Sequence, residues 1–112
     1  MLPTRLRRLP ATALPGGLVL YTAATPRSRL LGLAGLPDMP AHAALLLPRC
    51  RAVHTFGMRF PLDLLFVGAE LVEGVRPRRV VGRRGASAVV EARAGEGARF
   101  AAALSGWRRP DP

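Results

Sequence analysis

The apolar residues of this chain gather in short runs, and the length of those runs limits the structures that it can form. The three main runs are Leu18–Tyr21, Ala43–Leu47 and Leu62–Val67, the last interrupted only by Asp63. Each has the length of a β-strand, and none approaches the roughly 18 apolar residues that a membrane-spanning helix requires. The runs therefore predict a β-rich chain without a transmembrane segment.

Turn and helix signals divide the rest of the chain. Gly68–Ala69 predicts a tight turn into a strand over Glu70–Val75. Further extended segments are expected at 51–60, 80–81 and 88–90, and helices at 26–35, where Thr25 would be the N-cap, and at 96–104. The prediction is a mainly β (α+β) fold, either a single compact twisted sheet or a small barrel-like domain, with two short helices.

Length and composition set the domain organisation. The 112 residues suffice for one domain, and a hydrophobic content of 49% excludes a disordered chain. Residues 1–17 are predicted to form an irregular basic N-terminal arm, 18–107 the single domain, and 108–112 a C-terminal tail.

The charge is strongly positive, with 17 basic and 7 acidic residues giving a net charge of +10, and every basic residue is arginine. The codon bias of a GC-rich genome explains much of this composition. The densest patch contains no aromatic residue, and the sequence has no zinc-finger, helix-turn-helix or RNA-binding-sheet motif. We therefore expect no specific nucleic-acid binding. Weak binding to acidic surfaces is expected at most, through the patch Arg76, Arg78, Arg79, Arg83 and Arg84.

Cys50 is the only cysteine, so no internal disulfide forms, which fits a reducing compartment. Near the N-terminus, Pro10 and Pro15 interrupt a stretch that would have to be a continuous apolar helix in a secretory signal, so the expected location is the cytoplasm. In an extended strand Cys50 and His54 would lie about 13 Å apart, too far to share a zinc ion. We accordingly predict neither a metal nor a cofactor.

Two carboxylates stand out because they interrupt or end apolar strands. Asp63 lies inside Leu62–Val67, where a lone charge is costly unless it is paired or protonated; His54, Arg59 and Arg29 are the expected partners. A structural ion pair or backbone cap and an acid–base or ligand-binding role both remain open. Glu91 follows Ala88–Val90, and it is either an exposed strand end or, if it meets Asp63, the second group of an acid–base pair.

His54 and Met58 are predicted to share one face of an extended segment with Phe56 and Phe60. That face is either a core face with a hydrogen-bonded histidine or a shallow apolar pocket with one polar handle. The sequence contains no glycine-rich phosphate loop, nucleophile elbow or HExxH motif. No catalytic residue is therefore assigned.

Three segments of the chain resemble the DUF192 (UPF0127) family in order and spacing: RLLGL at 29–33, VHTFGMRFPLDLLFV at 53–67 and VEARAG at 90–95. Many members carry a W-M-K-N-T type of segment before the P-L-D triplet, whereas this chain has HTFGM at 54–58, as in another branch. The resemblance spans about residues 18–105 and implies a small, mainly β domain with no established activity. Many relatives are exported or lipid-anchored. The positions that the resemblance implies for a shared site are Arg29, Gly32, Met58, Pro61, Asp63, Glu91 and Gly95.

The leading functional hypothesis is a noncatalytic module that binds a small ligand or a protein. Its candidate contacts are Arg29, His54, Met58, Asp63 and Glu91. The alternative is a small acid–base enzyme, a hydrolase or lyase, that uses Asp63 with His54 or Glu91. A third hypothesis is an adaptor that docks its arginine patch on an acidic partner or an anionic lipid surface.

Overall fold

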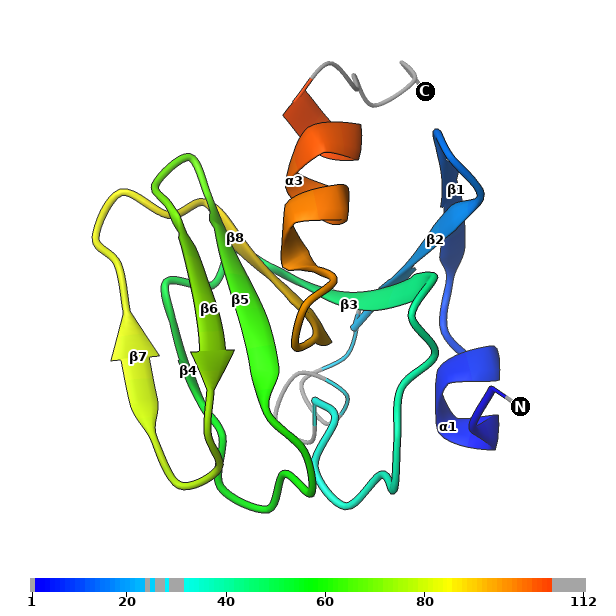
Figure 1. Cartoon of the computed structure of the whole chain (residues 1–112), viewed down its shortest axis with the longest axis horizontal. Helices are drawn as coiled ribbons and strands as arrows, with labels where there is room; N and C mark the ends of the chain where they lie inside the picture. The colour runs from blue at the N-terminus through cyan, green and yellow to red at the C-terminus, as the bar shows by residue number, and fades with distance from the viewer. Residues whose placement is uncertain (1, 24, 26–27, 29–31, 106–112) are drawn as a thin grey trace.

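The computed structural model describes residues 2–23, 25, 28 and 32–105. These residues form eight strands and two helices (Figure 1). In chain order the elements are α1 (Thr4–Arg7), β1 (Ala11–Leu14), β2 (Leu18–Thr22), β3 (Ala43–Pro48), β4 (Ala52–His54), β5 (Leu62–Val67), β6 (Leu71–Val75), β7 (Val80–Gly82), β8 (Ala88–Arg93) and α3 (Gly97–Ser105).

Six strands form one sheet in the order β1-β2-β3-β8-β5-β6, and β4 and β7 form a second, two-stranded sheet. Strands β2 and β3 are parallel, whereas every other neighbouring pair is antiparallel. The mainly β fold with two short helices is therefore confirmed. Strands β3, β8 and β5 occupy the middle of the large sheet, which is why their sequences are apolar at almost every position.

The large sheet separates the core into two parts, one on each of its faces. One face carries α3, and its buried cluster includes Leu20, Ala44, Val90 and Phe100; we call this the helix face. The opposite face carries the larger cluster, with residues such as Leu45, Leu64, Phe66 and Val89. Because successive side chains of a strand point to opposite faces, neighbouring residues of β5 and β8 belong to different clusters.

The N-terminal segment is more regular than the predicted irregular arm. Residues 4–7 form α1, and β1 pairs with β2 in a hairpin that aligns Ala11 with Tyr21. Gly16 and Gly17 have φ values of +83° and +76° and make the turn of that hairpin. The two glycines, which in the sequence indicated irregular structure, thus supply the positive φ angles that the tight turn between β1 and β2 needs.

Two other expectations need correction. The segment 51–60 is extended only over β4, because the chain turns after His54 and Gly57 has a φ of +81°. The expected helix at 26–35 falls largely on residues 26, 27 and 29–31, which lie outside the described part. Thr25 and Ser28 make the hydrogen bonds of an N-terminal cap, with the Ser28 N–H donating to Thr25 Oγ1 at 3.1 Å. Residues 32–35 form a turn.

Candidate functional site

Asp63 is held by the backbone of three glycines. Its side chain is 2% exposed on the helix face, beneath α3. The N–H of Gly74 donates to Oδ1 at 2.9 Å, and the N–H groups of Gly95 and Gly97 donate to Oδ2 at 2.9 and 2.8 Å. These three amide donors satisfy both oxygens of the buried carboxylate.

Local irregularities bring these glycines to the carboxylate. Strand β6 has one more residue than β5 between their paired positions on either side of Asp63, and Gly74 lies in that bulge at a φ of +63°. Gly95, at a φ of +94°, turns the chain from β8 into α3. A Cβ atom on Gly97 would lie 2.6 Å from Asp63 Cβ, so only glycine lets the start of α3 approach this closely.

The predicted partners of Asp63 are therefore wrong for the part of the chain that the structure describes. Neither His54 nor Arg59 hydrogen-bonds to it, and both are exposed. The third expected partner, Arg29, lies outside the described residues. Because backbone donors occupy both oxygens beneath packed side chains, Asp63 joins β5, β6 and the start of α3 rather than facing a cleft.

Glu91 is the second buried carboxylate among the described residues, and it differs from Asp63 in having an oxygen atom without a hydrogen-bond partner. It is 2% exposed, and its Oε1 accepts no hydrogen bond from any described residue. Burial raises the pKa of Glu91 to about 8, because the charged form loses its hydration. Glu91 is therefore mostly protonated at neutral pH.

Two family positions surround Glu91. A Cβ atom on Gly32 would lie 3.0 Å from Glu91 Oε1 and 3.8 Å from Met58 Cε, so the backbone of Gly32 lies against both side chains. The guanidinium of Arg5 in α1 donates through Nη2 to the carbonyl oxygens of Gly32 and Ala34 at 3.1 and 2.6 Å. The N-terminal helix thus holds the turn that closes over Glu91.

The register of β5 and β8 places the two carboxylates on opposite faces of the sheet. Asp63 pairs with Ala92, whereas Leu64 pairs with Glu91. Cross-strand partners share a face, so Glu91 points with Leu64 into the larger core cluster and Asp63 points toward α3. An acid–base pair of Asp63 and Glu91 is therefore excluded by geometry.

The predicted face of alternating side chains does not exist beyond β4. His54 is exposed, and its ring centroid lies 6.0 Å from that of Phe56, which is 50% exposed. Met58, in contrast, is buried in the larger core cluster. The structure thus brings Met58 to Glu91 and leaves His54 on the surface.

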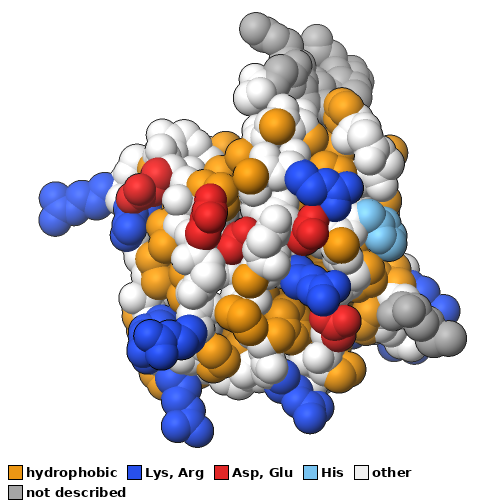
Figure 2. Space-filling model, viewed as in Figure 1, with side chains coloured by type: hydrophobic (Ala, Val, Ile, Leu, Met, Phe, Trp, Pro, Cys, Tyr) orange, Lys and Arg blue, Asp and Glu red, His pale blue; other side chains and the backbone are white. Residues whose placement is uncertain are grey.

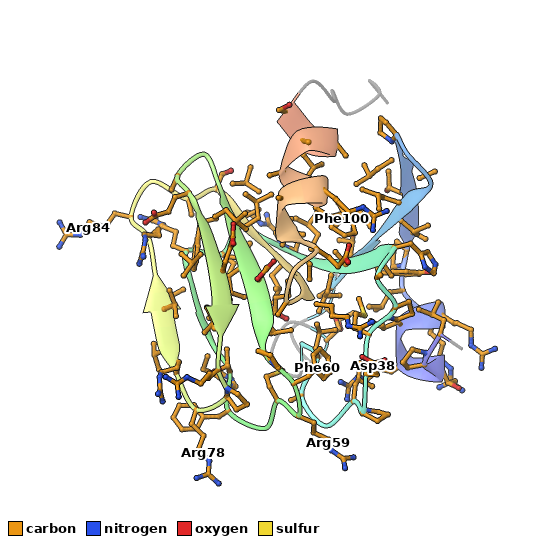
Figure 3. All side chains as sticks on the ribbon, in the orientation of Figure 1. Asp38, Arg59, Phe60, Arg78, Arg84 and Phe100 are labelled. Atoms are coloured by element: carbon orange, nitrogen blue, oxygen red, sulfur yellow. The ribbon has the colours of Figure 1, made fainter. Side chains whose placement is uncertain are left out.

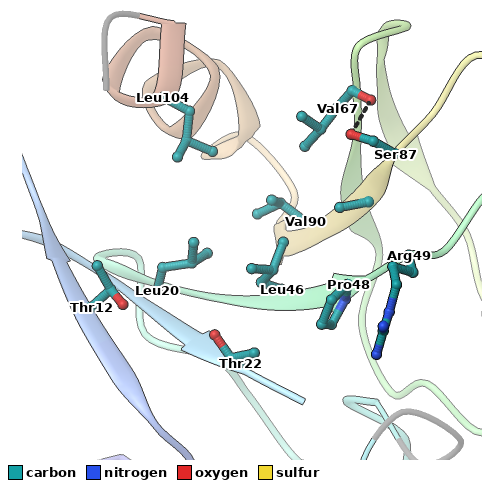
Figure 4. Close-up of a pocket in the computed structure, with 11 residues that line it drawn as sticks. Thr12, Leu20, Thr22, Leu46, Pro48, Arg49, Val67, Ser87, Val90 and Leu104 are labelled. Carbon is teal, nitrogen blue, oxygen red and sulfur yellow. Dashed lines mark hydrogen bonds between the residues drawn. The ribbon is translucent and has the colours of Figure 1, made fainter. Parts of the chain in front are cut away.

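A cleft of about 450 Å³ opens on the helix face, where α3 is too short to cover the whole sheet (Figure 4). Its apolar walls include Leu20 of β2, Leu46 of β3, Val90 of β8 and Leu104 of α3. The remaining lining residues are Thr12, Thr22, Pro48, Arg49, Val67, Ser87 and Ala88.

None of the predicted site residues that the structure describes lines this cleft, which was not predicted from the sequence. Its floor consists of ordinary strand residues, which in the sequence cannot be distinguished from covered core positions. The one available signal is that a nine-residue helix cannot span six strands.

None of the helices in the described ranges is long and apolar enough to cross a bilayer.

The fold and the hydrogen bonds of Asp63 define a small β domain in which a buried aspartate links strands β5 and β6 to the C-terminal helix α3. The chain belongs to the DUF192 family, whose model, described as "Uncharacterized ACR, COG1430", matches residues 14–103. The family predicted from the sequence is thus confirmed, and α1 with most of β1 precedes the matched region.

Two solved structures share the fold. A Sinorhizobium meliloti protein, described provisionally as a transcription regulator, is 23% identical with a TM-score of 0.64, covering 81% of this chain and 83% of its own. A Novosphingobium aromaticivorans protein of unknown function is 18% identical with a TM-score of 0.64, covering 90% of this chain and 93% of its own. No curated protein matches the sequence. At these identities the likeness shows the fold alone.

Proposed function

We propose that this chain is a noncatalytic module that binds a small apolar molecule in the cleft on the helix face. The observation that carries the proposal is a cleft of about 450 Å³ with mainly aliphatic walls. Small-molecule sites commonly occupy about 300–1,000 Å³ and combine apolar walls with few polar groups. We keep the cytoplasm as the proposed compartment, since Cys50 forms no disulfide within the chain.

The lining indicates the chemistry of the ligand. Leu20, Leu46 and Val90 form an apolar floor, whereas hydroxyl groups come from Thr12 and Thr22. These hydroxyls can hydrogen-bond to one polar end of a ligand that is apolar along most of its length. Arg49 is the one charged side chain among the described lining residues. No carboxylate of a described residue lines the cleft, and Glu91 points to the other face of β8 from Val90.

Filling the cleft is expected to abolish binding. Ala88 is a half-buried lining residue, and Ala88→Phe places an aromatic ring in the cavity without removing a core side chain. The neutral probe N-phenyl-1-naphthylamine should bind the native chain saturably, with increased fluorescence. We expect Ala88→Phe to weaken that binding at least about tenfold.

Ala98→Phe is the matched control, because Ala98 is exposed on α3 and does not line the cleft. It should leave the affinity for the probe within about twofold of the native value. Equal affinity in the native chain and in Ala88→Phe would place the probe elsewhere and contradict the proposal.

A second candidate function is supported by Glu91. A buried carboxyl that has no described partner and a pKa raised to about 8 by burial is a proton donor at neutral pH. Of the two pairs considered for an acid–base enzyme, Asp63 with Glu91 fails on geometry and Asp63 with His54 fails on hydrogen bonding. The remaining candidate for an acid is Glu91, whose side chain, like that of Met58, lies against the backbone of Gly32.

This candidate predicts a specific pH profile. If Glu91 acts as a general acid, hydrolysis of a series of nitrophenyl esters should fall as pH rises through about 8, because the carboxyl then loses its proton. Glu91→Gln should remove the activity, and the exposed Glu73→Gln should not. Equal rates in the native chain and Glu91→Gln would eliminate the enzyme hypothesis.

A further inference from the structure

The structure places three arginines of the patch, Arg76, Arg78 and Arg79, beside exposed apolar side chains, an arrangement that the sequence does not reveal. Phe56 and Val80 are the large hydrophobic side chains with high exposure in the described ranges, at 50% and 72%. Val80 pairs with His54 across the β4–β7 ladder, and His54 contacts Phe56. We call the surface formed by His54, Phe56, Arg59, Arg76, Arg78, Arg79 and Val80 the basic tip.

A single buried threonine holds this surface together. Thr55 is 0% exposed; its hydroxyl donates to the carbonyl of Arg76 at 2.7 Å and accepts from the N–H of Arg79 at 2.8 Å. Its backbone carbonyl accepts the N–H of Arg78 at 3.2 Å. The loop that bears three arginines is thereby fixed next to Phe56 rather than left to move freely.

Arg78 has an unusual backbone conformation in this loop. Its φ of +65° lies in the left-handed region, where glycine or asparagine is favoured and other residues are strained. In Figure 3, Arg59 and Arg78 project outward from the same edge of the molecule. In Figure 2 most of the acidic side chains visible in that view lie away from this edge; Asp38, which Figure 3 labels on the side of Arg59, pairs with Arg93.

The charge of the basic tip is uncompensated along the chain. Residues 49–62 and 74–90 contain no Asp or Glu. Arg83, at the other end of β7, is different: it pairs with Glu70 and lies over the ring of Phe66, 5.7 Å from its centroid. Arg59, Arg76, Arg78 and Arg79 are exposed and form no ion pair with a described carboxylate.

We propose that the basic tip docks the chain on an anionic lipid surface. Arginines bind lipid phosphates, and exposed Phe56 and Val80 between them can enter the headgroup region. A single-stranded nucleic acid fits less well, because stacking platforms need several aromatic rings. Here the outer face of the β4–β7 sheet carries Ala52, His54, Val80 and Gly82. This surface is separate from the cleft, so the two proposals can fail independently.

The test measures binding of the full chain to vesicles of phosphatidylcholine with and without phosphatidylglycerol, at low and high salt. We expect binding only to the anionic vesicles and release by salt. Each arginine near such a surface changes the affinity about fivefold, so Arg78→Gln with Arg79→Gln should weaken binding ~25-fold. Phe56→Ser with Val80→Ser should weaken binding while leaving its salt dependence unchanged.

The matched control is Arg8→Gln with Arg84→Gln, which removes the same net charge away from the basic tip: Arg8 follows α1, and Arg84 is far from Arg78 in Figure 3. Circular dichroism checks that every variant is folded. Binding of the control within about twofold of the native chain supports the proposal. Absence of binding to anionic vesicles at low salt overturns it, as does an equal loss in the control. Tighter binding to a single-stranded oligonucleotide, lost in both tip variants, would also overturn it by assigning the tip to nucleic acid.

Discussion

Asp63→Ala is expected to lower the free energy of unfolding by about 4 kcal/mol, because it removes the acceptor of three backbone N–H groups, of which that of Gly97 is buried and those of Gly74 and Gly95 are partly buried. Each buried donor left unpaired costs about 1–3 kcal/mol, and a domain of this size is stable by only about 5–15 kcal/mol. Urea denaturation followed by circular dichroism measures the effect.

Glu73→Ala is the control for this prediction, since Glu73 is an exposed carboxylate on the neighbouring β6. Its stability should lie within about 0.5 kcal/mol of the native value. A similarly small effect in Asp63→Ala would mean that the three hydrogen bonds from backbone amides contribute little to stability and that the carboxylate has another role.

Glu91→Gln is expected to change how stability depends on pH. The folded pKa of Glu91, raised by burial to about 8, exceeds the ordinary value of 4.5 that it regains on unfolding. Between these values the unfolded chain has released a proton that the folded chain keeps. The native chain should therefore lose up to about 1.4 kcal/mol of stability per pH unit as pH rises through this range, from this group alone.

The difference in stability between Glu91→Gln and the native chain isolates this effect, because all other titrating groups are shared. Relative to the native chain, Glu91→Gln should become more stable as pH rises from 5 to 8, and the difference should stay constant above pH 8. Glu73→Gln should show no such trend. Parallel curves for Glu91→Gln and the native chain would show that Glu91 is charged when folded and has a partner.

The sequence predicts the strands more reliably than the connections. Leu62–Val67 and Ala43–Leu47 form strands because their apolar residues suit both faces of a buried sheet. The segment after His54 was predicted to be extended because it contains phenylalanines and a threonine, yet Thr55 turns the chain by bonding to residues more than 20 positions away. Such long-range hydrogen bonds leave no periodic pattern.

The two carboxylates show the same limit for the site. That Asp63 is buried could be predicted from its apolar neighbours, but its partners are backbone amides of distant glycines, which no charge pattern indicates. For Glu91, an exposed strand end was one of the two predictions from the sequence. The residue is instead buried in β8, in the middle of the large sheet. The face on which each lies depends on strand register, which the sequence alone did not determine.

Methyl NMR spectra of the chain titrated with N-phenyl-1-naphthylamine test most directly whether the ligand site is the helix-face cleft. Because Val90 and Glu91 point to opposite faces of β8, the two possible locations have separate reporters. We predict shifts at the methyl groups of Leu20, Leu46, Val90 and Leu104, with Leu64 and Met58 unchanged. Shifts at Leu64 and Met58 with the cleft methyls unmoved would contradict a site on the helix face.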